Sequence, residues 1–185
     1  LPILAACTPA YTLVPAKSVG VAKNSIRVEP LSAWNRITNR GDDLKWEENW
    51  TRNGPALDVV SFIGGLPDGT AIVKQAKKAD RKVPVFRASM TPPDLVSMIE
   101  SFYRIRAGAT VFETTAVEPA TFLGSQGLRF DYTYVGADEV KRRGRCIAAI
   151  INDRLYLMLL NAAASHYFEA TLPEFEAMAA SARLG

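Results

Sequence analysis

The fold is decided by residues 143–161, RGRCIAAIINDRLYLMLLN, which hold two apolar runs separated by Asn152-Asp153. Both turn residues tolerate the left-handed backbone that a tight hairpin requires. We therefore predict antiparallel strands over residues 143–151 and 155–161. From Cys146 to Ile151 every residue is apolar, so both faces of a strand over these residues would be apolar. This pattern predicts a central strand that is covered on both faces.

Turn residues on the N-terminal side of this hairpin indicate further strands. Asn53-Gly54 is a strong hairpin signal, and the glycines of residues 64–69 surround Pro67, whose φ is preset for a turn. Trp46 and Trp50 also have the spacing of a helix, so a helix remains an alternative for their segment. The predicted strands cover residues 44–52, 57–63, 70–74, 111–115 and 128–135.

Two segments have the start signals of helices. Thr91 is a good N-cap before Pro92, and apolar residues then recur at helical spacing to about residue 106. Thr171 to Glu174 resembles a capping box, which predicts a second helix from Thr171 to about residue 183. The predicted fold class is α+β. It is an α/β/α sandwich with an antiparallel sheet of about six or seven strands and helices on both faces.

The composition is that of one folded domain, which we assign to residues 19–185. The chain has 185 residues, of which 48% are hydrophobic and 22% charged. Its net charge of +3 is small and mostly scattered, so we predict no nucleic-acid partner. Basic residues cluster only in 74–82 and 141–145, where solvated loops or strands are expected. No apolar run approaches the roughly 20 residues of a membrane-spanning helix.

The N-terminal residues Leu4-Ala5-Ala6-Cys7 resemble a bacterial lipobox. This resemblance implies a residual signal segment over 1–6, acylation of Cys7, and a lipidated tether over 7–18, which Pro9 and Pro15 would keep extended. The bilayer is then a partner through acylated Cys7. The expected location is the bacterial cell envelope, facing the periplasm. Thr8, which is not Asp, favours the outer over the inner membrane. An ordinary apolar start to a cytosolic protein is the alternative.

The C-terminal third resembles a known fold family. Residues 154–159 (RLYLML), 166–169 (HYFE) and 181–184 (SARL) are similar to the PsbP-like α/β/α class, which includes a Ran-binding release factor. Residues 48–51 (ENWT), followed by Asn53-Gly54, are reminiscent of small bacterial lipoproteins of this shape. The resemblance implies a PsbP-like domain and a scaffold for protein contacts, and it transfers no nucleotide, chlorophyll or metal site.

Catalytic chemistry has little support in the sequence. His166 is the only histidine, so any triad would need it as the general base. The acid pairs Asp42-Asp43 and Glu47-Glu48 lack regular metal-ligand spacing and are expected to be solvated. The glycines of residues 64–69 do not form a phosphate-binding P-loop. We predict no catalytic residue, no metal and no cofactor. Cys146 is expected to be a buried, unpaired thiol.

Four residues remain as candidate binding residues: Trp34, Trp46, Trp50 and His166. Exposed indoles stack on sugars or anchor protein interfaces, although burial in the core is the favoured interpretation of the tryptophans. The leading hypothesis is a membrane-tethered periplasmic lipoprotein that acts as a non-catalytic binding or scaffold module for an envelope protein or glycan. One alternative is a glycan- or peptidoglycan-binding domain that uses exposed tryptophans. The other is a hydrolase of unknown class that uses His166.

Overall fold

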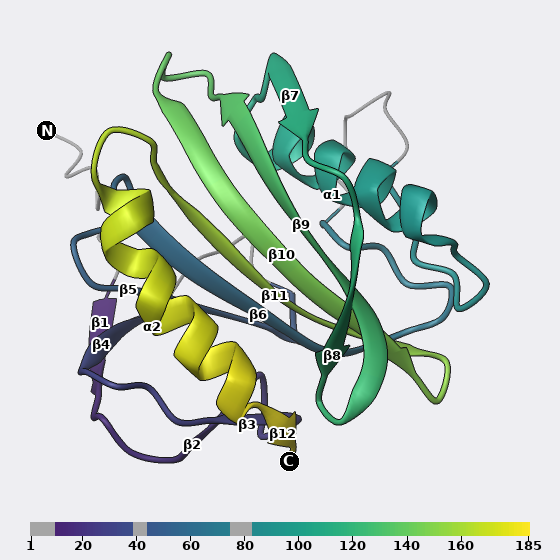
Figure 1. Cartoon of the computed structure of the whole chain (residues 1–185), viewed down its shortest axis with the longest axis horizontal. Coiled ribbons are helices and arrows are strands. Elements are labelled where there is room, and N and C mark those ends of the chain that lie inside the picture. Colours follow the sequence, from purple (N-terminus) through teal and green to yellow (C-terminus); the bar gives the residue numbers. More distant parts are fainter. Residues whose placement is uncertain (1–9, 39–43, 75–82) are drawn as a thin grey trace, which may run out of the picture.

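The computed structural model describes residues 10–38, 44–74 and 83–185. In this part of the chain, nine antiparallel strands form one twisted sheet in the order β1-β4-β5-β6-β11-β10-β9-β7, with β8 also paired to β9 (Figure 1). The strands are β1 (Ala10–Val14), β4 (Trp34–Thr38), β5 (Glu47–Thr51), β6 (Asp58–Pro67), β7 (Val111–Thr114), β8 (Glu118–Phe122), β9 (Ser125–Val135), β10 (Lys141–Ile151) and β11 (Arg154–Ala163).

The predicted central hairpin is confirmed. Ile151 pairs with Arg154 across a two-residue turn in which Asn152 and Asp153 have φ values of 49° and 57°. These left-handed values match the turn type that follows the twist of the flanking strands. β10 pairs with β9 on its other side, and β11 pairs with β6. The hairpin therefore forms the middle of the sheet, and the other strands add outward from it.

The two helices pack on opposite faces of the sheet, as predicted. Helix α1 (Pro92–Arg106) shares one core with the residues of β6, β10 and β11 that face it, and helix α2 (Tyr167–Ser181) shares the other core with the alternate residues. Cys146, for example, lies in the α1 core and Ile147 in the α2 core. Burial raises the pKa of the Cys146 thiol well above its usual range. The two-sided apolar pattern of β10 therefore has the predicted cause.

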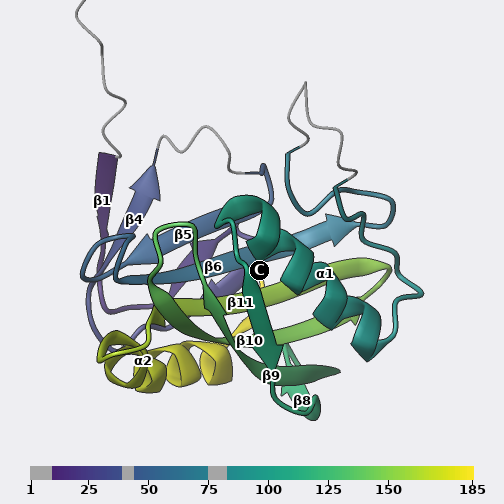
Figure 2. The same cartoon turned by 90° about the horizontal axis from the view of Figure 1, so that it is seen from above.

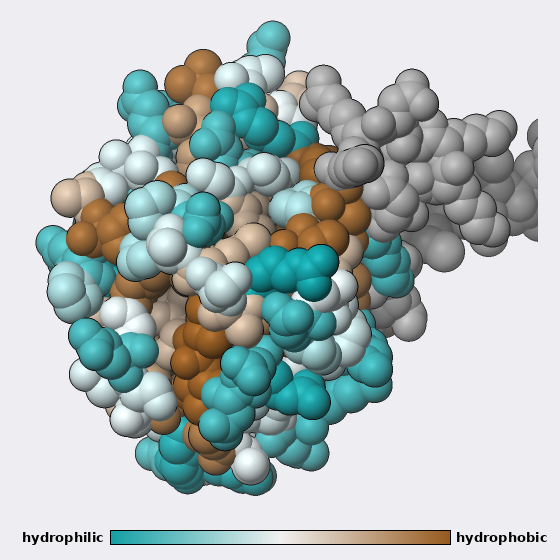
Figure 3. All heavy atoms as spheres, turned by 90° about the vertical axis from the view of Figure 1, so that its right-hand side faces the viewer, coloured by the Kyte–Doolittle hydropathy of each residue, from teal (hydrophilic) through white to brown (hydrophobic). Residues whose placement is uncertain are grey.

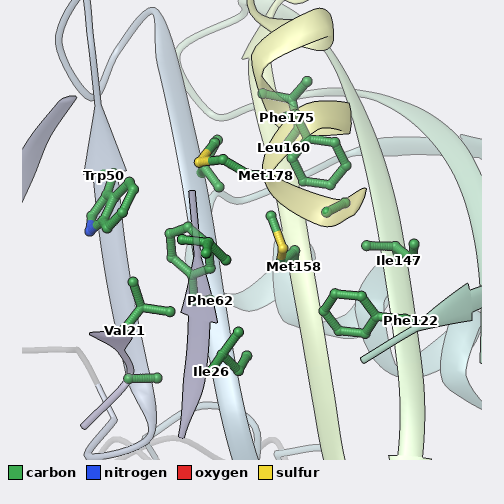
Figure 4. Close-up of a cluster of buried hydrophobic side chains, with 14 of the residues drawn as sticks. Val21, Ile26, Trp50, Phe62, Phe122, Ile147, Met158, Leu160, Phe175 and Met178 are labelled. Atoms are coloured by element: carbon green, nitrogen blue, oxygen red, sulfur yellow. The ribbon is translucent and has the colours of Figure 1, made fainter. Parts of the chain in front are cut away.

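A small second sheet completes the α2 side. It consists of β2 (Val19–Val21), β3 (Ile26–Val28) and β12 (Arg183–Leu184), in the order β12-β3-β2. Figure 4 shows Val21 and Ile26 in the same cluster as Phe62 and Met158 of the large sheet. These short strands, which the sequence analysis missed, close the core and bring residues from both ends of the chain together.

The structure corrects several predicted elements. The large sheet has nine strands instead of six or seven, because β1, β4 and β8 also join it. The predicted strand over 70–74 is wrong, since Ala71 makes only an isolated bridge with Val85. The predicted turn over 64–69 begins later, because β6 continues to Pro67. Helix α2 begins one turn before Thr171, because Phe168 is already buried in the core and draws that turn into the helix.

The expected tether also differs from the structure. Ala10–Val14 forms β1, which pairs antiparallel with β4 at one end of the sheet (Figure 2). A free spacer through residue 18 is therefore wrong for these residues. Pro15 follows β1 and cannot donate to a strand ladder, which gives a physical reason for the end of the strand. Cys7 lies outside the described residues.

A tyrosine network crosses the α1 face of the sheet. Tyr132 of β9 lies over Gly144 of β10, and its hydroxyl donates to the carbonyl of Leu160 in β11 at 2.7 Å. The hydroxyls of Tyr103 and Tyr132 are 2.6 Å apart, and Tyr134 donates to Asn161 at 2.9 Å. Burial raises the pKa of Tyr134 to about 12 and those of Tyr103 and Tyr132 well above their usual range.

Alkaline pH is expected to destabilise the protein through these three phenols. The unfolded chain releases their protons near pH 10, whereas burial raises the pKa of each phenol in the folded chain, to about 12 for Tyr134. The folded state thus binds more protons above pH 10, so the free energy of unfolding falls as pH rises through this window. Phenolate absorbance recorded with circular dichroism should show that ionisation of these phenols accompanies unfolding. Tyr134→Phe should reduce the dependence of the free energy of unfolding on pH. Ionisation of all tyrosines at pH 11 in protein that is still folded would contradict the prediction.

Candidate functional site

Two of the candidate tryptophans belong to the core. Trp34 and Trp50 are fully buried, with ring centroids 6.4 Å apart, and Trp50 packs edge-on against Phe62 at 4.8 Å. The indole nitrogen of Trp50 donates to Glu48 at 2.8 Å. Neither ring is available to a sugar or a partner protein. Trp46 differs, because it lies in the turn before β5 and is only partly buried.

His166 occupies the exposed N-cap position of α2. Its ring contacts the neighbouring Tyr167 edge-on at 5.4 Å. In the described part of the chain, no hydrogen bond joins the imidazole to a carboxylate or a hydroxyl. A nearby open cavity of about 530 Å³ is lined by Ser165 but not by His166. The geometry therefore does not assemble the base and nucleophile that the hydrolase alternative requires.

The acid pair Glu47-Glu48 is structural, and its expected solvation is wrong. Glu47 forms an ion pair of 2.6 Å with Arg106 of α1. Glu48 forms one of 2.6 Å with Arg36 and also accepts the backbone N–H of Ala22 at 2.9 Å. Asp42-Asp43 lies outside the described residues, and within those residues no cluster of three or more potential metal-ligating side chains occurs.

The cluster of basic residues in 141–145 is largely neutralised. Arg142 donates a hydrogen bond to the Asp138 carboxylate, and this bond holds the pKa of Asp138 well below its usual range. Arg143 stacks its guanidinium over the Phe168 ring at 4.2 Å. The ion pairs are Arg142–Asp138, Arg143–Glu169, Arg145–Asp131 and Arg145–Glu176. Most of the other cluster, residues 74–82, lies outside the described residues.

An open cavity of about 320 Å³ combines the features expected of a binding site, and we call it the Trp46 pocket. It lies where the turn between β2 and β3, the turn before β5, the end of β6 and the start of β11 meet. Its lining residues are Ala22, Lys23, Ser25, Lys45, Trp46, Gly64, Gly65, Arg154 and Tyr156.

One wall of the Trp46 pocket is a strained turn. Ala22, Lys23 and Asn24 have consecutive φ values of 47°, 59° and 61°, in the left-handed region that costs a residue with a side chain about 1 kcal/mol or more. Val21 and Ile26, which flank the turn, are anchored in the core (Figure 4). The turn therefore presents Lys23 at the pocket from a fixed position.

Another wall of the Trp46 pocket contains a β-bulge. The pairing of β6 with β11 shifts register at Leu155/Tyr156, so that Gly65, with φ of 78°, has no direct partner. A Cβ on Gly65 would lie 3.2 Å from the Tyr156 hydroxyl, so the tyrosine lies directly beside the bulge. Arg154 donates from Nη1 to the Gly65 carbonyl at 3.1 Å. Bulges often re-aim side chains beside functional sites.

The pocket is strongly cationic. Lys23, Lys45 and Arg154 line it, whereas none of the acidic residues that the structure describes does. In the described part of the chain these three side chains form no ion pair, unlike the arginines of β10. The Lys45 ammonium lies 4.4 Å from the centroid of the Trp46 ring, a cation–π contact that orders it without neutralising it.

Two other cavities have different chemistry. A cavity of about 130 Å³ beneath the end of α1 is lined by the polar side chains of Asn49, Ser61 and Asn161. Another, of about 270 Å³, is largely apolar and lies between the start of α1, the start of β9 and the end of β10. Figure 3 views the molecule from this side and shows hydrophobic side chains gathered in a band between hydrophilic ones. Among the described residues, the charged side chain that lines either cavity is Arg106, which is paired with Glu47.

Solved structures show what the fold resembles. The chain superposes on cyanobacterial PsbP from Synechocystis with a TM-score of 0.61 and 14% identity, over 98% of this chain and 99% of that one. The yeast (Saccharomyces cerevisiae) Ran-binding protein Mog1p gives 0.52 and 7%, over 96% of both chains. LpqN of Mycobacterium tuberculosis, described as involved in cell envelope biogenesis, gives 0.38 and 9%, over 96% of this chain and 89% of that one.

The comparisons confirm a PsbP-like fold, with a sheet larger than predicted and few helices. No protein-family model and no curated protein matches the chain. No helix in the described residues is long and apolar enough to cross a bilayer. Because a shared fold does not fix a function, the function has to be argued from the Trp46 pocket.

The sequence analysis singled out only Trp46 among the residues of this pocket. Lys23, Lys45, Arg154 and Tyr156 come from three separate segments, and the resemblance of residues 154–159 to the PsbP-like class gave Arg154 and Tyr156 no binding role. Gly64-Gly65 was the available signal, since adjacent glycines often mark close backbone contacts as well as turns. Here Gly64 makes room for Ser25, because a Cβ on it would lie 1.8 Å from the serine hydroxyl.

Proposed function

We propose that the protein is a non-catalytic binding module of the bacterial cell envelope, and that the Trp46 pocket takes its ligand. The carrying observation is the convergence of three cationic side chains without ion pairs on a cavity with two aromatic side chains. Such charges repel one another, and an anionic ligand would relieve that repulsion. The strained turn beside them supports a functional interpretation, because strain of this kind clusters at ligand sites.

Attachment to the membrane through acylated Cys7 is part of this proposal. Because β1 begins at Ala10, three residues after Cys7, the extended chain between them spans at most about 11 Å. The folded domain would then lie close to the bilayer surface instead of at the end of a long tether. We propose the outer membrane, facing the periplasm, on the basis of Thr8.

Palmitate labelling tests the anchor. The full precursor is expressed in a bacterial host with labelled palmitate, and the chain should become labelled and fractionate with membranes. Cys7→Ser should abolish both. Equal labelling of the variant would contradict acylation of Cys7, whereas the binding function of the pocket would be unaffected by that result.

Tryptophan fluorescence tests the pocket, because Trp46 is the only partly exposed indole of the three. The Cys7→Ser protein is titrated with phosphorylated and neutral envelope components, including peptidoglycan fragments. A ligand should change the emission of this protein but leave that of its Trp46→Phe derivative unchanged. A neutral fragment that acts in this way would support the glycan alternative. A change that persists without Trp46, or no change with any component, would contradict binding at this site.

A further inference from the structure

We infer that the ligand of the Trp46 pocket carries a phosphate monoester. This inference rests on the proposed function and specifies its ligand class. Lys23, Lys45 and Arg154 supply three positive charges at a cavity whose described lining contains no acid. A phosphate monoester carries about 1.5 to 2 negative charges at pH 7 and three acceptor oxygens. A carboxylate carries one charge and two oxygens, so it would leave more of this positive charge uncompensated.

The donors of the pocket are arranged for such a group. Arg154 uses one Nη1 hydrogen bond to hold its guanidinium beside the bulge at Gly65. In the described part of the chain its Nε and Nη2 groups have no partner, so they remain available to bind two oxygens in a fork. Lys45 is placed by the Trp46 ring and Lys23 by the strained turn. Each cation therefore has a support that leaves its charge free.

The size of the pocket limits the rest of the ligand. Its volume of about 320 Å³ is at the lower end of the range of roughly 300–1,000 Å³ for small-molecule sites. A phosphate with a small polar group fits this volume better than a long segment of polymer. The hydroxyl of Tyr156, beside the bulge, is a further hydrogen-bonding group for that polar portion. The shared chemistry is a phosphomonoester, either soluble or in the headgroup of a lipid.

Titration calorimetry of the Cys7→Ser protein with glycerol 3-phosphate tests the inference. Arg154→Gln and Lys23→Gln should each weaken binding about tenfold or more, because each removes a charge-assisted contact. Arg129→Gln is the matched control. It removes an arginine that pairs with Glu118 at 2.7 Å and does not line the pocket, and binding should not change. Binding should also weaken as pH falls through about 6, where the phosphate loses its second charge.

Vesicles distinguish the two sources of phosphate. Phosphatidic acid has a monoester headgroup and phosphatidylglycerol has a diester of one charge. If the protein sediments with phosphatidic acid vesicles but not with phosphatidylglycerol vesicles, and the Arg154→Gln protein does not sediment, the ligand is a lipid headgroup. If the protein binds glycerol 3-phosphate but neither kind of vesicle, the ligand is soluble. Equal binding of acetate, equal affinity of the Arg154→Gln protein, or no binding in either arm would overturn the inference. Binding of a neutral glycan through Trp46 would contradict a phosphate ligand but would still support the proposed function as a binding module.

Discussion

Replacing Arg106 with leucine is expected to lower the free energy of unfolding by about 3–5 kcal/mol. Arg106 lies in the last turn of α1 and binds Glu47 of β5 through both terminal nitrogens, at 3.0 and 2.6 Å. The side chains are 12% and 0% exposed. Leucine would leave the Glu47 carboxylate buried without its counter-ion, and that desolvation outweighs the added apolar contact.

Arg104→Leu is the matched control on the same helix. Arg104 pairs with Glu100 one turn earlier, but these side chains are 42% and 34% exposed. An exposed pair of this kind contributes about 0.5 kcal/mol or less. Urea unfolding monitored by circular dichroism measures both variants. Equal effects of the two substitutions would show that the burial of the Glu47 pair does not determine its contribution.

Replacing Gly144 with alanine is expected to cost about 3 kcal/mol, at the upper end of what overpacking a core costs. The new Cβ would lie 2.2 Å from Cζ of Tyr132 and 2.3 Å from the Leu160 carbonyl oxygen. Neither can yield easily, since Tyr132 is fixed by hydrogen bonds at its hydroxyl and the carbonyl belongs to the central strand β11. The substitution would push the Tyr132 ring away from the sheet.

Gly124→Asn is the comparison for this effect. A Cβ at Gly124 meets no atom within 4 Å, and its φ of 74° is a conformation that asparagine tolerates. We expect a loss below about 1 kcal/mol. Thermal unfolding of both variants checks the pair. If Gly144→Ala has the same melting temperature as the parent protein, the close packing of Tyr132 over β10 does not contribute to stability.

The elements that local signals specify were predicted well. Asn152-Asp153 fixes the central hairpin, Thr91 and Pro92 fix the start of α1, and the two-sided apolar pattern of β10 predicts helices on both faces. In each case the residues that determine the element are adjacent in the sequence, so pattern and propensity are enough.

Elements that depend on distant partners were missed. β12 has two residues and pairs with β3 from the other end of the chain. β2 and β3 pair with each other, but with three residues each they are too short to give a pattern. Trp46 and Trp50 are four residues apart, and only the packing of the sheet makes one partly exposed and the other buried. The candidate site has the same difficulty, because Arg154 lies more than 100 residues along the chain from Lys23 and Lys45.

The C-terminal strand β12 has a consequence for the order of folding. Its residues pair with β3, and the backbone N–H of Gly185 donates to the carbonyl of Ser25, within the turn that presents Lys23. During synthesis the N-terminal half of the pocket leaves the ribosome long before residues 183–185 do. The turn therefore gains its last support only when residues 183–185 are in place. Ligand binding would accordingly report that β12 has paired with β3, and a substitution of residues 183–185 that breaks this pairing would affect the site although none of them lines it.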